Sequence, residues 1–139
     1  MPLPHERMTS DMCCKTDADR QIMKGKAYRQ YVGALNYMSS QGVRADVAFA
    51  VSELSRYNDC AGPGHWEHLV RVLHYLRKHP YHGVLFPRTG GFAMRATCDS
   101  DYNGNPDERT SKTGVTIDVG GALFHYLCRA QKWTAKSVG

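Results

Sequence analysis

The chain has 139 residues, of which 42% are hydrophobic and 22% are charged. This is enough for one ordinary domain or two small pieces, and the balance argues against intrinsic disorder. A formal net charge of +5 and a pI near 9.0 form a modest basic excess, which suits a polyanionic partner but does not identify one.

Two further observations concern the compartment. No apolar run approaches the roughly 20 residues that cross a bilayer, and the amino terminus lacks the layout of a signal peptide, so we expect a soluble chain with no membrane partner. The cysteines are odd in number, scattered and without a C-x-x-C pair, which predicts neither a disulfide framework nor a zinc knuckle. They are Cys13, Cys14, Cys60, Cys98 and Cys128. We therefore expect a reducing intracellular location, cytoplasmic or nuclear.

Residues 1–25 contain Pro2, Pro4 and several charges, without a usable hydrophobic periodicity. Such a stretch is typical of irregular structure. We predict an extended arm over residues 1–25.

Residues 26–82 contain three segments with the periodicity of amphipathic helices. We expect them over residues 26–40, over about residues 46–57 with Asp46 as N-cap, and over about residues 65–79. The apolar stripes are Tyr28, Tyr31, Val32, Ala34, Leu35 and Met38; Val47, Ala50, Val51, Leu54 and Tyr57; and Trp66, Leu69, Val70, Leu73 and Leu76. Helices of roughly 12 to 15 residues are marginal alone, so we predict that these stripes meet in a three-helix bundle.

The third helical segment carries a row of basic residues opposite its apolar stripe. Arg71, His74 and Lys78 follow one another at steps of three and four residues, with Arg77 alongside. Two interpretations are open: a solvated helix face, or a row of contacts to the phosphates of a nucleic acid.

Histidines near this helix raise the question of a zinc site. His65 and His68 are three residues apart, and His79 and His82 flank the end of the helix. No cysteine or carboxylate completes a recognised ligand spacing, so we interpret them as surface histidines.

Residues 92–98 alternate loosely between apolar and polar side chains, as a half-buried strand does, and Asp99 follows directly. A carboxylate on such a rigid strand end can bind a hard cation such as magnesium. Further on, residues 114–119 and 122–127 predict a β-hairpin that turns at Gly120-Gly121.

An EF-hand calcium loop is one alternative for the segment around Asp99. Its opening pattern is met by Asp99, Asp101, Asn103 and Gly104. The match then fails, because Thr110 stands where the loop requires a bidentate glutamate and no helix pattern precedes the loop.

A second resemblance extends along nearly the whole chain. Residues 28–37 resemble Y-R-x-L-V-G-S-L-x-Y, residues 44–52 resemble R-P-D-I-A-F-A-V-S, and residues 71–77 resemble R-V-L-R-Y-L-K. Residues 99–106 and 107–114 are similar to D-A-D-W-A-G and D-x-R-x-S-T-S-G, and Gln131-Lys132 looks like K-Q-K. These are blocks of copia-type retrotransposon Pol polyproteins, in the same order.

The resemblance implies an α+β chain, with a reverse transcriptase thumb-like helical region over 26–82 and a truncated ribonuclease H-like region over 83–139. It implies that Arg71, His74, Arg77 and Lys78 contact an RNA–DNA hybrid or DNA duplex. Asp99 would be the first catalytic, metal-binding carboxylate, with Mg²⁺ as cofactor in the complete enzyme.

The resemblance also sets expectations about activity. The paired polymerase aspartates of the family lie upstream, and the helix with the second ribonuclease H carboxylate would follow Gly139. Two-metal hydrolysis needs several carboxylates, so we expect the isolated chain neither to polymerise nor to cleave. The alternative is a non-catalytic remnant that binds nucleic acid or protein. Strands without covering helices would also favour contact with the rest of Pol, or self-association through an open strand edge.

Overall fold

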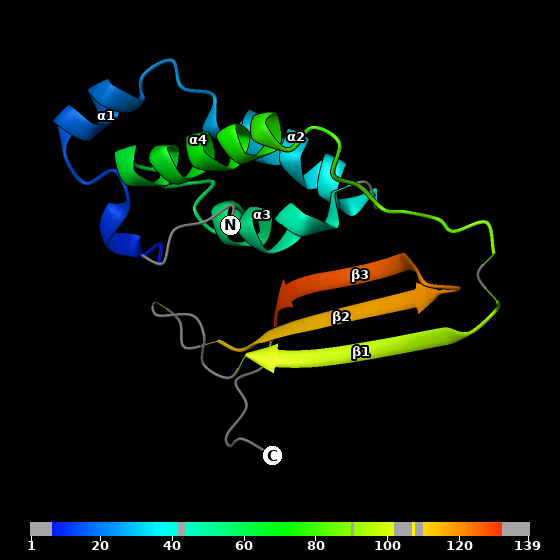
Figure 1. The fold of residues 1–139 in the computed structure, drawn as a ribbon. Helices are drawn as coiled ribbons and strands as arrows, with labels where there is room; N and C mark the ends of the chain where they lie inside the picture. Colours follow the sequence, from blue (N-terminus) through cyan, green and yellow to red (C-terminus); the bar gives the residue numbers. More distant parts are fainter. Residues whose placement is uncertain (1–6, 42–43, 90, 102–106, 108–109, 132–139) are drawn as a thin grey trace. The chain divides into compact units, whose positions relative to one another are not determined.

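The computed structural model describes residues 7–41, 44–89, 91–101, 107 and 110–131. The chain divides into two compact units, Met1–His82 and Gly83–Gly139. Within the described residues the first contains all the helices and the second a three-stranded antiparallel sheet (Figure 1). The expected α+β class is confirmed.

The helical unit has four α-helices and two short 3-10 turns among its described residues. In chain order they are η1 (Ser10–Met12), α1 (Asp17–Met23), α2 (Tyr28–Ser40), η2 (Ala45–Val47), α3 (Ala48–Ser55) and α4 (Pro63–Lys78). α1 begins with a capping box in which Thr16 and Asp19 bind each other's backbone N–H groups. α4 begins with Pro63, whose missing N–H is no loss in the first turn of a helix.

The core lies among α2, α3 and α4, as predicted, but Tyr31 and Ala34 of the first expected stripe are exposed. The five residues expected to share a face in the second helical segment are all buried, with exposed fractions of 3% or less. Tyr28, Val32 and Leu35 of α2 are buried against them. The buried hydroxyl of Tyr28 donates to the carbonyl oxygen of Leu54 at 2.9 Å, which ties α2 to α3.

The interpretation of His65 and His68 as surface histidines is wrong. His65 is fully buried and His68 is 8% exposed. The ring of His65 stacks on Tyr57 at 4.1 Å, and its Nδ1 accepts from the N–H of Gly62 at 3.2 Å. An imidazole with its own partners can occupy a core position, which turns α4 further toward the core than an apolar stripe alone indicates.

The prediction of an extended arm over residues 1–25 is also wrong where the structure describes this segment. η1 and α1 lie within it, and Met8 is 3% exposed in the core. The hydroxyl of Tyr57 donates to the carbonyl oxygen of Met8 at 3.0 Å. The segment is therefore an integral part of the helical unit.

A disulfide fastens the same segment. Cys13 is bonded to Cys60, with their Cα atoms 5.1 Å apart, and the N–H of Cys14 donates to the carbonyl oxygen of Cys60 at 3.0 Å. The sequence-based expectation of no disulfide is thus corrected by one cross-link between positions 47 residues apart. Spacing in the sequence does not reveal such a pair, because the fold brings its members together.

The second unit is a sheet in the order β1-β2-β3. The strands are β1 (Met94–Asp101), β2 (Lys112–Val119) and β3 (Ala122–Ala130). β2 and β3 form the predicted hairpin, and Gly120 and Gly121 at its turn have φ angles of +58° and +83°, which favour glycine. The buried hydrophobic cluster of the described residues lies wholly in the helical unit, so the sheet has no comparable core.

The close packing of the N-terminal segment leaves no room for a side chain at Gly62. A Cβ atom built on Gly62 would overlap the carbonyl oxygen of Met12, whereas one on Gly33, in the exposed middle of α2, would meet nothing within 4 Å. We predict that Gly62→Ala lowers the free energy of unfolding by about 2 kcal/mol or more, because backbone must move. The matched change Gly33→Ala should raise it by about 0.5 kcal/mol through helix propensity. Urea denaturation of both variants checks this, and equal stabilities would contradict it.

Candidate nucleic-acid interface

The four basic residues singled out on the third helical segment all lie on α4 and are all exposed. They are Arg71, His74, Arg77 and Lys78. At 3.6 residues per turn they occupy the side of α4 opposite Leu69 and Val72, which are fully buried. Among the residues that the structure describes, none of the four forms a salt bridge. We call this set the α4 basic row.

One carboxylate shares the surface of the α4 basic row. Glu67 is exposed and precedes Arg71 by four residues, so the two lie on the same face. Arg77 and Lys78 are in the last turn, where the helix dipole also favours positive charge. The cationic side chains of the row are therefore most closely spaced toward the C-terminal end of α4, where they are also stabilised by the helix dipole.

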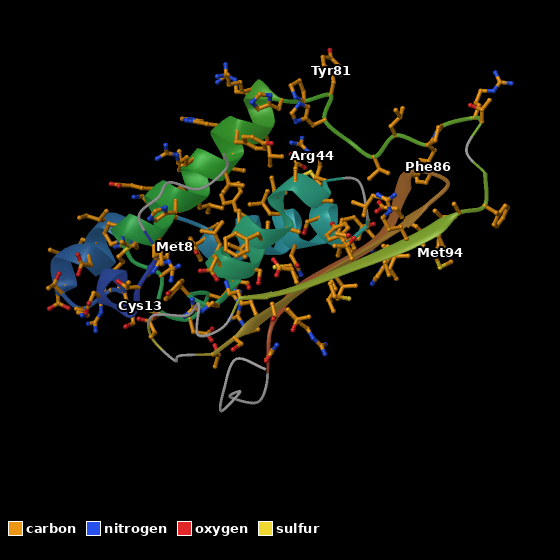
Figure 2. The ribbon with its side chains drawn as sticks, turned by 60° about the horizontal axis from the view of Figure 1, so that its bottom comes forward. Met8, Cys13, Arg44, Tyr81, Phe86 and Met94 are labelled. Carbon is orange, nitrogen blue, oxygen red and sulfur yellow. A yellow bond between two sulfur atoms is a disulfide. The ribbon has the colours of Figure 1, made fainter. Side chains whose placement is uncertain are left out.

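Arg44 holds that end in place. It is only 5% exposed, and its guanidinium makes a forked pair with Asp46, from Nε at 2.9 Å and from Nη2 at 2.8 Å. Its Nη1 donates to the carbonyl oxygen of His79, just after the last turn, at 3.0 Å. Figure 2 shows Arg44 beside the C-terminal end of α4, while Met8 and Cys13 lie toward the other end of the helical unit.

The role expected for Asp46 as an N-cap is wrong. The N-cap of α3 is Val47, and no side chain caps it. The carboxylate of Asp46 instead accepts from Arg44, and this hydrogen bond lowers its pKa below the usual 3.8. Arg44 and Asp46 are part of the copia-like block in the sequence, but only the fold shows that the buried Arg44 forms an ion pair with Asp46 beside the end of α4.

Two histidines lie just after the C-terminal end of α4. The rings of His79 and His82 stack at 4.7 Å, and His79 also contacts Tyr75 at 4.8 Å. Partial burial and the neighbouring His82 and Lys78 lower the pKa of His79. Between them in the chain, Tyr81 is 98% exposed, and Figure 2 shows it near the C-terminal end of α4. Sequence reasoning did not single out Tyr81.

Asp99 lies within β1, which continues to Asp101, so the expectation of a strand ending at Asp99 is corrected. It is exposed opposite Gly114, and its Oδ1 accepts from the N–H of Ser100 at 2.8 Å. The described residues contain no group of three or more histidine, cysteine or carboxylate side chains that could hold a metal. The surroundings described therefore do not fit a Mg²⁺ site, and we derive no catalytic step from Asp99. Its metal-binding role stays a prediction.

The zinc site and the EF-hand calcium loop also stay predictions. The histidines of the zinc alternative are not part of any metal-holding group among the described residues. In the EF-hand alternative, Asn103 and Gly104 lie outside the described residues. As for membranes, no helix in the described ranges is long and apolar enough to cross one.

The chain is similar to segments of plant retrotransposon Pol polyproteins. The retrovirus-related Pol polyprotein from transposon RE2 of Arabidopsis thaliana is 32% identical over 110 residues, which are 79% of this chain and 7% of the polyprotein. The corresponding polyprotein from transposon TNT 1-94 of Nicotiana tabacum is 29% identical over 133 residues, 96% of this chain and 10% of its own length. No family model and no solved structure matches the chain.

A shorter relative is similar over most of its length. The secreted RxLR effector protein 161 of Plasmopara viticola is 32% identical over 115 residues, which are 83% of this chain and 80% of that protein. The chain thus belongs to the same family as this effector. Its similarity to the plant transposon polyproteins supports an origin from a retrotransposon Pol. It spans only about 7% of the length of the RE2 polyprotein.

The Arg44–Asp46 pair gives a pH-dependent prediction. Because the pKa of Asp46 is lowered in the folded chain, its contribution to stability is present above pH 3.8 and is lost as the pH falls through the lower folded-state pKa. We expect Asp46→Asn to cost about 2 kcal/mol at pH 7, since Arg44 keeps its burial but loses its charged partner.

Denaturation from pH 7 down to pH 2 provides the measurement. The difference in the free energy of unfolding between the parent and Asp46→Asn should become smaller below pH 3.8. The control is Asp17→Asn, which removes an exposed pair with Arg20 and should cost less than about 0.5 kcal/mol. If this difference in the free energy of unfolding were constant from pH 7 to pH 2, it would contradict a lowered pKa of Asp46 in its pair with Arg44.

Proposed function

We propose that the helical unit binds the phosphate backbone of a nucleic-acid duplex through the α4 basic row, as the thumb-like part of a retrotransposon Pol. One observation carries the proposal: four adjacent basic side chains project from one side of α4 without a salt bridge to any described residue. Similarity to retrotransposon Pol polyproteins supports it.

The dimensions of the row suit a phosphate backbone. From Arg71 to Lys78 the helix rises by seven steps of about 1.5 Å, or roughly 10 Å in all. The phosphates of one DNA strand rise about 3.4 Å each along the duplex axis, so the row can lie along about three of them. Contacts to phosphates fix position without reading sequence, so we expect little sequence preference.

The rigidity of the support matters as much as the charges. Long basic side chains lose conformational entropy when they bind, and a helix end that moved would add to this cost. The three hydrogen bonds of Arg44 tie the last turn of α4 to η2. The cations nearest this anchor, Arg77 and Lys78, are therefore presented on a fixed support.

Ribonuclease H activity and Mg²⁺ belong to the whole Pol protein in this proposal. Asp99 would supply one metal ligand from the strand unit, and the remaining ligands would come from elsewhere. Duplex binding by the helical unit does not depend on catalysis, so it holds equally if the chain acts as a non-catalytic remnant.

The test is binding to a fluorescently labelled RNA–DNA hybrid over a series of salt concentrations. We expect the variant Arg71→Ala, Arg77→Ala, Lys78→Ala to bind more weakly at low salt. The slope of log K against log salt should become smaller by about three units if each cation neutralises one phosphate.

The matched control removes three cations from the same unit. Lys15→Ala, Arg20→Ala, Arg29→Ala gives the same change in net charge, but each of these cations already has a carboxylate partner. This variant should keep most of the affinity and slope. Equal losses in the two variants would show that only net charge matters, and an unchanged α4 variant would refute the interface.

A second candidate is a secreted, disulfide-stabilised protein, and the Cys13–Cys60 bond is the observation that favours it. Disulfides persist in oxidising compartments and are rare in the cytosol. The relative from Plasmopara viticola is named as a secreted effector.

Alkylation of the chain in an acid-quenched extract of cells that express it distinguishes the two locations. A secreted chain keeps its disulfide, so two of the five cysteines are protected and three are alkylated. A chain held in the reducing cytosol should be alkylated at all five. Mass spectrometry counts the adducts, and five adducts would contradict secretion.

A further inference from the structure

β1 is an open edge of the sheet. In the part of the chain that the structure describes it pairs with β2 alone, so the other side of its backbone has no strand partner. Its side chains from Met94 to Ser100 are all exposed. An exposed edge of eight residues is a template on which another strand can add.

The charges on β1 select the strand that fits this edge. Side chains alternate between the two faces of a strand, so Arg95, Thr97 and Asp99 lie on one face. Arg95 and Asp99 carry opposite charges on either side of Thr97, and neither forms a salt bridge within the described residues. Arg95 is opposite Asp118 on β2, and Asp99 is opposite Gly114.

We propose that the chain forms a two-fold symmetric homodimer by antiparallel pairing of β1 with β1 of a second copy, centred on Thr97. In this register Arg95 of each copy lies directly opposite Asp99 of the other, so the dimer gains two pairs of opposite charge. On the other face Ala96 lies opposite Cys98, and Met94 lies opposite Ser100. No like charges face each other there, and each pair includes a small side chain. The pairing uses the strand unit and does not rest on nucleic-acid binding.

The other edge of the sheet offers no such match. β3 carries the cation Arg129 and no carboxylate, so pairing of β3 with itself creates no opposite-charge pair. Pairing of β1 with β3 of another copy is head-to-tail and would produce open polymers instead of a closed dimer. A symmetric β1 pair therefore provides hydrogen-bond partners for the backbone of the β1 edge and forms a closed dimer.

The experiment is sedimentation equilibrium of the full chain without nucleic acid. Every protein carries Cys98→Ser, so that the exposed thiol of Cys98 cannot link two chains covalently. We expect a monomer–dimer equilibrium. Arg95→Glu and Asp99→Arg should each raise the dissociation constant about tenfold or more, because each places like charges opposite one another twice in the dimer.

The double variant Arg95→Glu, Asp99→Arg restores opposite charges in this register alone and should bring the dissociation constant back to within about threefold of the parent. The matched control Arg129→Glu reverses an exposed charge on β3 and should leave it unchanged. A parent that stays monomeric, a double variant as weak as the single ones, growth beyond the dimer, or an equal effect of Arg129→Glu would each overturn the proposal.

Discussion

The helical unit depends on the interaction of Arg44 with Asp46 and with the carbonyl oxygen of His79. A guanidinium that is 5% exposed is costly to bury unless its donors are satisfied, and here three of its nitrogens donate within 3.0 Å. One side chain thereby binds the loop before α3 and the end of α4. It also supplies a donor for the carbonyl oxygen of His79, the C-cap residue that follows the last turn of α4.

The two units differ in what stabilises them. The helical unit has a continuous apolar core, which the N-terminal segment completes through Met8 and the Cys13–Cys60 disulfide. The sheet has no comparable core among its described residues, and Phe92 and Met94 are 98% and 73% exposed. Strand pairing alone gives marginal stability, because a sheet must bury one face against another layer. The sheet unit is therefore the part of the chain that gains most from a partner.

Much of this fold could be predicted from hydrophobic periodicity, and the errors have physical causes. The face of α3 and the hairpin at Gly120-Gly121 were predictable because spacing and turn chemistry agree there. The N-terminal segment was missed because its contacts are tertiary: Met8, Cys13 and Met12 pack against residues about 50 positions away. The burial of His65 was missed because a polar residue can enter a core when its own hydrogen bond and ring stacking are provided there.

The candidate site shows the same limit. The α4 basic row was predictable, since it depends only on helical spacing and charge. The part played by Arg44 was not, because a motif with a buried guanidinium looks the same in a sequence as an exposed ion pair. For Asp99 the sequence indicated a strand-end carboxylate, but a metal site needs several ligands from separate elements, and the position of those elements is a tertiary property.

Asp99 can either bind a metal ion or pair with an arginine across the β1 edge, but its surroundings do not allow both at once. A carboxylate that faces an arginine across a strand pair has that arginine's charge within a few ångströms, and the same positive charge opposes the approach of a divalent cation. A carboxylate on an uncovered β1 edge is open to a cation, but among the described residues it belongs to no group of three or more potential metal ligands. The strand or helix that covers the β1 edge therefore decides the chemistry of Asp99. If a second copy covers it, Asp99 is a structural charge; if another part of a Pol protein covers it and brings carboxylates, Asp99 can become a metal ligand.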